Sequence, residues 1–273
     1  GSAFVWTDGT VAVTNAHVVG DAEEVLLIDR TGKEETALVI ATDPVRDVAV
    51  IALAPGREGL ALAETASELG TEVYALGAPL GVEFSLTKGL ISATERQVDI
   101  TVPMSLLQHD AAVNPGSSGG PLVDAEGRLL GMNSQIADGS RMFVGIAYAI
   151  SVADLDRIVT GLIEETLPAY PQLGLTARAV DHKVAEALGV EAAGLLLDAV
   201  TPEGLAEAAG LKAGDVILGV DGAALTNPGD MAFAIEAALE AGEANLTVRR
   251  AGEEIEDPGG VGRRAEASMC GCC

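Results

Sequence analysis

The sequence predicts a mostly β protein built from two domains. Short apolar runs of strand length, such as residues 11–13 and 48–53, lie between polar or glycine-rich segments in the first half of the chain. A length of 273 residues is sufficient for two domains that each bury a core. Two longer stretches, residues 152–163 and about 228–241, repeat apolar residues at helical spacing. We therefore expect a β-rich first domain, a helix at its end, and an α+β second domain.

The most distinctive stretch of the first half is residues 114–121, Asn-Pro-Gly-Ser-Ser-Gly-Gly-Pro. Glycine adopts backbone conformations that are closed to other residues, and it lets another segment approach closely. A serine in such a loop can present its hydroxyl beside unpaired backbone N–H groups, as a nucleophile with an oxyanion hole does. Taken alone, the stretch is equally compatible with a turn between two strands.

Two further polar residues lie at the ends of apolar runs. His17 follows the run at residues 11–13, and Asp47 precedes the run at residues 48–53. Singly, such a histidine is more often structural, and such an aspartate is more often a cap. Together they supply the base and the orienting acid that a nucleophilic serine requires, in the order His, Asp, Ser. That order matches chymotrypsin and differs from α/β-hydrolases and subtilisin.

Three segments resemble the catalytic blocks of the HtrA (Deg) serine proteases. They are residues 13–19 (Val-Thr-Asn-Ala-His-Val-Val), residues 43–50 (Asp-Pro-Val-Arg-Asp-Val-Ala-Val) and residues 110–123, which contain the glycine-rich stretch. Residues 145–150 resemble the apolar strand that closes the protease domain of that family. The resemblance extends to about residue 250. It implies a chymotrypsin-like fold of two six-stranded β-barrels, followed by one α+β PDZ domain.

The resemblance also implies catalytic roles. Ser118 would attack the peptide carbonyl, His17 would act as general base and then general acid, and Asp47 would hold the imidazole. The backbone N–H groups of Gly116 and Ser118 would stabilise the oxyanion. The Gly-Gly-Pro that follows Ser118 sets the register on this serine, whereas the family usually has Asn at the preceding position. His109 stands where relatives usually have a small polar residue, and we expect it at the surface or in a subsite.

The same resemblance yields a prediction about substrates. In this superfamily the residue six before the nucleophile forms the base of the specificity pocket, and here it is Ala112. A small, uncharged residue at the bottom of the specificity pocket predicts cleavage after small or medium aliphatic residues, which unfolded proteins expose. A four-residue segment would pair with the substrate backbone as an added strand. It consists of Asn133, Ser134, Gln135 and Ile136, and Ile136 together with residues 138–141 would line or gate the pocket.

The second half resembles a PDZ domain of the HtrA type, most specifically at residues 209–215 (Ala-Gly-Leu-Lys-Ala-Gly-Asp) and the apolar run after them. In such a domain a peptide C-terminus adds a strand to an exposed edge, and backbone N–H groups bind its carboxylate. The groove helix would run over about residues 228–241, and part of its apolar face must serve the core. The alternative is a generic α/β domain with glycine turns. The predicted peptide-binding residues, for apolar C-termini, are Gln172, Leu173, Gly174, Leu175, Met231 and Ile235.

These assignments divide the chain into a trypsin-like serine protease domain (residues 1–166), a linker (167–171), a PDZ domain (172–251) and a disordered tail (252–273). The three cysteines, Cys270, Cys272 and Cys273, all lie in the tail, so the folded region has no disulfide framework. We expect an inert tail rather than a lipidated or metal-binding one. We also expect no metal and no cofactor.

The formal net charge of −25 excludes some partners. It argues against nucleic acids and anionic membrane surfaces, because these repel a strongly acidic protein. No apolar run approaches the roughly 18 residues of a transmembrane helix. The chain begins at a position inside the family's first barrel, so an N-terminal strand and any export signal or anchor are expected to be absent from it. The resemblance implies a periplasmic or extracytoplasmic location, and a homotrimer once the N-terminal segment is restored.

The predicted function is that of an ATP-independent serine endopeptidase of protein quality control. It would cut unfolded or damaged proteins, and its PDZ domain would bind apolar C-termini. The alternative is a proteolytically inactive chaperone or peptide-binding protein in this truncated form. Reaction of Ser118 with a serine-directed fluorophosphonate would separate the two.

Overall fold

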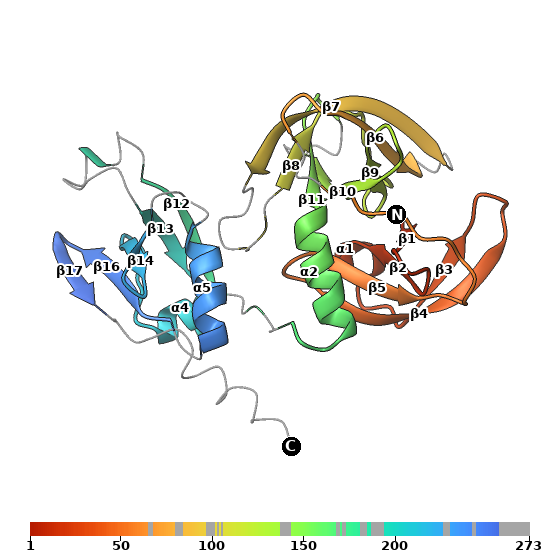
Figure 1. Cartoon of the computed structure of the whole chain (residues 1–273). Helices are drawn as coiled ribbons and strands as arrows, with labels where there is room; N and C mark the ends of the chain where they lie inside the picture. The colour runs from red at the N-terminus through yellow and green to blue at the C-terminus, as the bar shows by residue number, and fades with distance from the viewer. Residues whose placement is uncertain are drawn as a thin grey trace, which may run out of the picture. The chain divides into compact units, whose positions relative to one another are not determined.

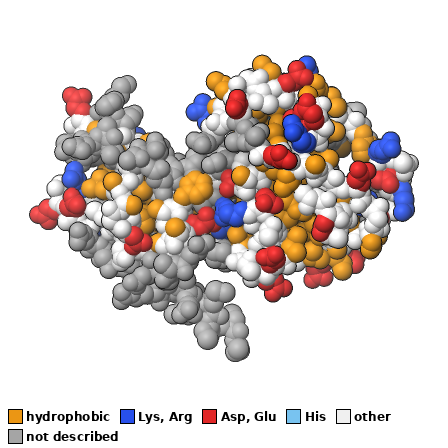
Figure 2. Space-filling view, viewed as in Figure 1, with side chains coloured by type: hydrophobic (Ala, Val, Ile, Leu, Met, Phe, Trp, Pro, Cys, Tyr) orange, Lys and Arg blue, Asp and Glu red, His pale blue; other side chains and the backbone are white. Residues whose placement is uncertain are grey.

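The computed structural model describes residues 1–64, 68–79, 84–96, 102, 104, 106–136, 143–167, 170, 173–180, 185–186, 194–225, 230–241 and 244–256. They form two compact units, of which the first comprises residues 1–96 and 104–167 and the second follows residue 167 (Figure 1). Strands predominate in both units, which confirms the prediction of a mostly β protein. On the face seen in Figure 2, acidic side chains are dispersed over both units rather than gathered in one patch.

The first unit begins with a five-stranded antiparallel sheet in the order β1-β2-β5-β4-β3. Its strands are β1 (Phe4–Val5), β2 (Val11–Thr14), β3 (Glu24–Ile28), β4 (Glu34–Asp43) and β5 (Val48–Ala52). Two of the inner strands, β2 and β5, are almost completely buried, which explains why their sequences are continuous apolar runs rather than alternating ones. The short helix α1 (Ala16–Val19) follows β2 after a single residue. This arrangement places the end of β2 beside the turn that precedes β5.

The second sheet of this unit is a closed barrel in the order β10-β11-β8-β7-β6-β9. Its strands are β6 (Glu72–Gly77), β7 (Ser85–Arg96), β8 (Leu106–His109), β9 (Pro121–Val123), β10 (Leu129–Ile136) and β11 (Ala147–Ser151). The closed barrel has the six strands that were predicted, whereas the first sheet has five. The glycine-rich stretch forms the connection between β8 and β9.

Helix α2 (Val152–Ile163) follows β11 directly and has the bounds that its periodicity predicted. The hydroxyl of Ser151 accepts a hydrogen bond from the N–H of Asp154 and so caps the first turn. Leu155, Ile158 and Val159 are buried in a core cluster shared with strands of both sheets. The helix therefore locks the two sheets of the first unit together.

The second unit is one sheet in the order β12-β13-β14-β16-β17, with β15 beside β14, so that β12 is an edge strand. Helix α5 confirms the helix predicted over about residues 228–241, and its role in a peptide groove stays a prediction. The predicted linker lies largely outside the described residues, as does the predicted tail from residue 257 onward, whereas residues 253–256 of that tail form a strand of the sheet. Within the described parts, no helix is long and apolar enough to cross a membrane. The elements are β12 (Leu175–Ala179), β13 (Leu195–Val200), α4 (Leu205–Ala208), β14 (Val216–Val220), β15 (Ala223–Ala224), α5 (Asp230–Ala241), β16 (Leu246–Arg250) and β17 (Glu253–Glu256).

An ion pair explains the distinctive turn before β14. Asp215 is only 1% exposed, and both of its carboxylate oxygens accept from the guanidinium of Arg250, at 2.7 and 2.8 Å. The same guanidinium donates to the carbonyl of Gly210 at 2.7 Å, and Asp215 also accepts from the N–H of Lys212. Such a two-pronged contact is strong and directional. This ion pair ties the turn before β14 to Arg250 at the end of β16, the strand that pairs with β14.

Candidate active site

His17 and Asp47 are in direct contact. Nδ1 of His17 lies 2.9 Å from each carboxylate oxygen of Asp47, and the backbone N–H of His17 donates to Oδ1 at 3.0 Å. His17 lies in α1, directly after β2, and Asp47 lies in the turn between β4 and β5, so the pairing of β2 with β5 brings them together. A carboxylate at Nδ1 favours the tautomer with its proton there and leaves Nε2 as an acceptor.

The contact with Asp47 raises the pKa of His17 above its ordinary value. The hydrogen bond to the carboxylate is the largest cause, and the negative charge of Asp47 acts in the same direction. Partial burial acts against both but is outweighed. His17 is therefore a stronger base than a free imidazole.

The backbone of Asp47 is held in an unusual conformation. Its φ of 55° lies in the left-handed region, which costs energy for a residue with a Cβ. The side-chain amide of Asn15, a fully buried residue, donates to the carbonyl of Asp47 at 2.9 Å. In the same turn Asp43 accepts from the N–H groups of Val45 and Arg46, and its carboxylate pairs with the buried Arg46 guanidinium. These bonds fix the turn that aims the Asp47 carboxylate at His17.

Ser118 is the accessible one of the two adjacent serines. Ser117 is 5% exposed, and its backbone joins the loop through bonds to Asn114 and Gly120 at 2.8 and 2.9 Å. Ser118 is half-buried, and its hydroxyl makes its hydrogen bond outside the loop, to the carbonyl of Ser134. The glycine at 116 is required by close approach, because a Cβ there would lie 2.3 Å from the carbonyl oxygen of Ala78. The geometry thus favours Ser118 as the reactive serine.

Ser134 connects the His17–Asp47 pair to Ser118. Its hydroxyl donates to Oδ2 of Asp47 at 3.0 Å, and its carbonyl accepts from the hydroxyl of Ser118 at 3.1 Å. Among the hydrogen bonds of the described residues there is none between Ser118 and His17. Ser134 was predicted only as a substrate-binding residue, so its contact with Asp47 was missed. A bond between residues so far apart in the chain leaves no local signal in the sequence.

The two backbone N–H groups predicted to form the oxyanion hole, those of Gly116 and Ser118, lie in the loop between β8 and β9. Within the described parts of the chain, neither the N–H of Gly116 nor that of Ser118 donates a hydrogen bond, while those of Ser117, Gly119 and Gly120 all do. Unpaired N–H groups beside a serine hydroxyl are the donors that a developing oxyanion requires.

The predicted substrate-binding residues lie next to this loop. Ala112 is partly exposed between two buried neighbours, and its carbonyl accepts from the hydroxyl of Thr87 at 2.7 Å. Asn133 is buried, and its backbone exchanges hydrogen bonds with Gly119 and Gly120 at 2.9 Å. Beyond it, Gln135 and Ile136 pair with β11 on one side, and the described residues provide no strand on the other. The side chains of Gln135 and Ile136, and residues 138–141, lie outside the described parts.

The expectation that His109 is a surface or subsite residue is wrong. It ends β8 at 0% exposure, opposite Ile91 and Ala147 on the neighbouring strands. Burial lowers the pKa of His109 to about 4, although the nearby Asn133 side chain and Ala111 backbone favour the charged form. Neither ring nitrogen makes a hydrogen bond of normal geometry within the described residues. His109 is therefore a neutral residue of the barrel interior.

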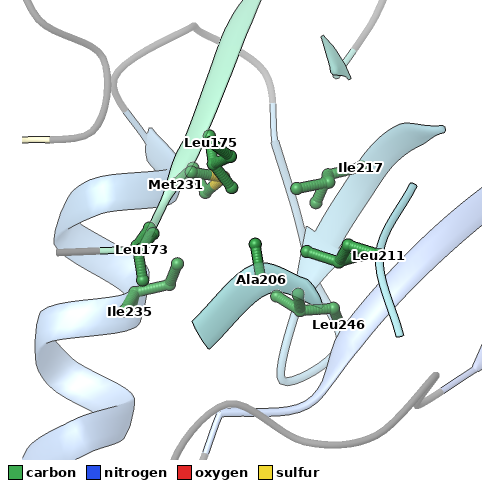
Figure 3. A pocket seen from close by; sticks show the side chains of 8 residues that line it. All are labelled: Leu173, Leu175, Ala206, Leu211, Ile217, Met231, Ile235 and Leu246. Atoms are coloured by element: carbon green, nitrogen blue, oxygen red, sulfur yellow. The ribbon is translucent and has the colours of Figure 1, made fainter. Parts of the chain in front are cut away.

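The second unit contains a small apolar hollow beside α5 (Figure 3). Leu175, the first residue of β12, and Leu173 just before it lie beside Met231 and Ile235 of α5 on one side of the hollow. Met231 and Ile235 are 0% and 1% exposed, so they serve the core as much as any groove. Gln172 lies outside the described residues, and the carbonyl of Gly174 accepts from Thr201. The hollow is lined by Leu173, Leu175, Ala206, Leu211, Ile217, Met231, Ile235 and Leu246.

No group of three or more metal-ligating side chains occurs among the described residues. The chemistry of the candidate site thus consists of a histidine oriented by a carboxylate, a serine hydroxyl and two unpaired N–H groups.

Comparison with known proteins identifies two matching family models. Residues 1–132 match the model described as a trypsin-like peptidase domain, and residues 197–250 match the model of a PDZ domain. A curated relative from Halomonas elongata, called a probable periplasmic serine endoprotease DegP-like, is 34% identical over 256 residues, which are 93% of this chain and 54% of the relative. A relative of the same name from Pseudomonas fulva is 34% identical over 92% of this chain and 53% of its own length. The chain spans about half the length of these curated relatives.

Solved structures agree with these matches. The HtrA-type protease AlgW with decapeptide superposes with a TM-score of 0.70 at 31% identity, over 94% of this chain and 80% of that chain. The serine endoprotease from Yersinia pestis superposes with a TM-score of 0.66 at 26% identity, over 96% of this chain and 87% of that chain.

Proposed function

Because the chain belongs to the HtrA family of serine proteases, we propose that it hydrolyses peptide bonds with Ser118 as nucleophile. His17 takes the proton of Ser118 and later delivers it to the leaving amine, and Asp47 stabilises the imidazolium that forms between these steps. The N–H groups of Gly116 and Ser118 bind the oxyanion of the tetrahedral intermediate. Loss of one such donor typically costs roughly 3–4 kcal/mol of transition-state stabilisation.

The observation that carries this proposal is the oriented His17–Asp47 pair together with the Ser118 loop, in which two N–H groups have no acceptor among the described residues. The 2.9 Å contacts at Nδ1 leave Nε2 as the basic atom. The hydroxyl of Ser118 must turn from the carbonyl of Ser134 toward Nε2 before it can lose its proton. Hydrogen bonds between catalytic groups are often unformed without substrate and tighten in the complex, so such a rotation is an ordinary step.

We further propose that the substrates are unfolded or damaged proteins, cleaved after small or medium aliphatic residues. Ala112 offers no charge to a basic side chain, and the edge of β10 beyond Asn133, which pairs with no strand among the described residues, suits an extended substrate backbone. Unfolded chains supply both features, because they expose aliphatic residues and unpaired backbone. Peptide hydrolysis by this chemistry consumes only water, so ATP is not required.

The second unit is proposed to bind apolar peptide C-termini. Its edge strand β12 lies beside α5, and Leu175 and Met231 both line the apolar hollow there. A peptide added to β12 would place its last side chain against this hollow. The names of the curated relatives support a periplasmic location, and the homotrimer stays a prediction.

A fluorophosphonate probe tests the proposed nucleophile directly. Wild type should be labelled, Ser118→Ala should not, and Ser117→Ala is the matched control that should keep the label. Absence of labelling in a folded wild-type chain would refute the assignment. Mass spectrometry of denatured casein digested by the wild-type protein then tests the aliphatic preference, and cleavage mainly after Lys or Arg would contradict that preference.

A second candidate function is that of a peptide-binding protein or chaperone with an inactive protease domain. The observation that favours it is the hydroxyl of Ser118, which bonds to Ser134 rather than to His17. In that case the folded chain would bind apolar C-terminal peptides, and it would neither react with the probe nor cut casein.

A further inference from the structure

Ser2 makes four hydrogen bonds to segments that are far apart in the chain. Its N–H donates to the carbonyl of Ser118 at 2.9 Å, and its hydroxyl donates to the carbonyl of Gly116 at 2.7 Å. The same hydroxyl accepts from the N–H of Ala78 at 2.9 Å, and the carbonyl of Ser2 accepts from the hydroxyl of Thr14 at 2.6 Å. All hydrogen-bonding groups of this residue are therefore used.

The bond to Gly116 acts on the peptide unit between the two predicted oxyanion donors. The carbonyl of Gly116 belongs to the planar unit that joins Gly116 to Ser117, so fixing its direction fixes that whole plane. The N–H of Gly116 lies on one side of this unit, and the N–H of Ser118 lies on the other. Gly116 has a φ of 107° and could adopt many other conformations, because glycine is not restrained by a Cβ. The loop thus needs an external restraint to keep both N–H groups aimed at one point.

The space around Ser2 fits this residue closely. A Cβ at Gly119 would lie 2.1 Å from the carbonyl oxygen of Ser2 and 2.2 Å from the hydroxyl oxygen of Thr14. A Cβ at Gly77 would lie 3.0 Å from the hydroxyl oxygen of Ser2. Glycines at these two positions therefore leave the room that the four hydrogen bonds require.

Ser2 also connects the two halves of the candidate active site. Thr14 is the last residue of β2, the strand that leads to His17, whereas Gly116 and Ser118 lie in the loop before β9. A single residue thus ties the strand that carries the base to the loop that carries the nucleophile.

We propose that Ser2 is a positioning residue for the oxyanion hole, which it holds in its binding orientation through the carbonyl of Gly116. The inference rests on the proposed function. Ser2 touches no reacting atom, so it acts on the transition state through the loop rather than on substrate binding. Its removal should lower kcat and leave KM and the pKa of His17 in place.

The test compares purified Ser2→Ala, Ser2→Thr and wild type on an aliphatic peptide ester. Ser2→Ala should lose roughly 10- to 100-fold in kcat, somewhat less than the loss of a whole oxyanion donor. KM should stay within twofold of the wild-type value. The midpoint of the pH–rate profile should not change beyond experimental error. Affinity for a peptide boronate, whose tetrahedral adduct occupies the oxyanion hole, should fall in parallel with kcat. Ser2→Thr keeps the hydroxyl and should recover most of the lost rate.

Two further variants guard against trivial outcomes. Thr10→Ala removes an exposed hydroxyl, bonded to Asp8 at 2.7 Å, and should leave kcat unchanged. Thr14→Val preserves side-chain volume but removes the donor to the carbonyl of Ser2, so it should lower kcat even if Ser2→Ala does not fold. A kcat of folded Ser2→Ala within twofold of an active wild type, or a change confined to KM, would overturn the inference alone. An inactive wild type would overturn the proposed function and this inference with it.

Discussion

The hydroxyl of Ser134 donates to Oδ2 of Asp47 at 3.0 Å, although 87 residues separate the two in the chain. The bond gives the Asp47 carboxylate a second donor besides His17 and fixes its plane. Ser134→Ala should therefore lower kcat/KM by roughly 10- to 150-fold, since one hydrogen bond to a charged group contributes about 1.5–3 kcal/mol. Steady-state kinetics on a peptide substrate would measure this. An unchanged kcat/KM would show that His17 and the turn alone hold the carboxylate.

Asp47→Asn should abolish most of the activity while the fold is kept. The amide cannot stabilise an imidazolium, and it favours the wrong tautomer of His17, so kcat should fall on the order of 10⁴-fold. Active-site titration and circular dichroism on the same sample would check both statements. Full activity in this variant would remove Asp47 from the catalytic group.

The pH dependence of the reaction should reflect the raised pKa of His17. Only neutral His17 can accept the proton of Ser118, so kcat/KM should be low in acid and rise to a plateau. The midpoint should lie above 6.5, the ordinary value, because Asp47 favours the imidazolium. Stability changes in the opposite sense, since the contribution of this pair is present below 6.5 and is lost as pH rises through the raised pKa. A rate profile with its midpoint at or below 6.5 would contradict the predicted shift.

His109 should make the first unit sensitive to acid. Its pKa is about 4 when folded and near 6.5 when unfolded, so unfolding takes up a proton between these values. Stability should fall by about 2 kcal/mol more between pH 7 and pH 5 in wild type than in His109→Leu. Fluorescence of Trp6, the single tryptophan and a core residue of the first unit, would follow unfolding at both pH values. Equal losses in the two proteins would mean that His109 is charged in the fold.

The Asp215–Arg250 pair should stabilise the second unit selectively. Asp215→Asn should cost about 2–3 kcal/mol, less than for a fully buried pair because Arg250 is partly exposed. Asp198→Asn is the matched control, since its ion pair with Arg178 is exposed and should contribute under about 1 kcal/mol. Urea unfolding followed by circular dichroism would show the change, while the Trp6 transition should stay in place. Equal effects of the two substitutions would refute the special role of Asp215.

Local patterns in the sequence were sufficient for the elements and for the candidate reactive groups. The helical spacing over residues 152–163 predicts α2 with its bounds, and the apolar runs predict β2 and β5. The glycines after Ser118 favour this serine over Ser117, and the structure leaves Ser118 the more accessible of the two. In each case the signal lies within a few residues of the feature that it predicts.

The supporting contacts could not be predicted, because they join segments that only the folded chain brings together. Ser2 reaches Gly116 across 114 positions, and nothing in the sequence around Ser2 indicates that partner. Asn15 could be read as part of a motif, but its bond to the carbonyl of Asp47 depends on the pairing of β2 with β5. His109 was misplaced for the same reason, since the burial of a strand end depends on its neighbours in the barrel.

The resting position of Ser118 bears on how a substrate would compete for the site. The carbonyl of Ser134 that accepts from its hydroxyl lies on the strand segment proposed to receive the substrate backbone. A substrate N–H that pairs with this carbonyl weakens its hold on the hydroxyl, because the two donors then share one oxygen. Substrate binding and release of the Ser118 hydroxyl are thereby coupled through the carbonyl oxygen of Ser134. A serine reagent too small to pair with that strand should therefore react more slowly than one built on an extended peptide.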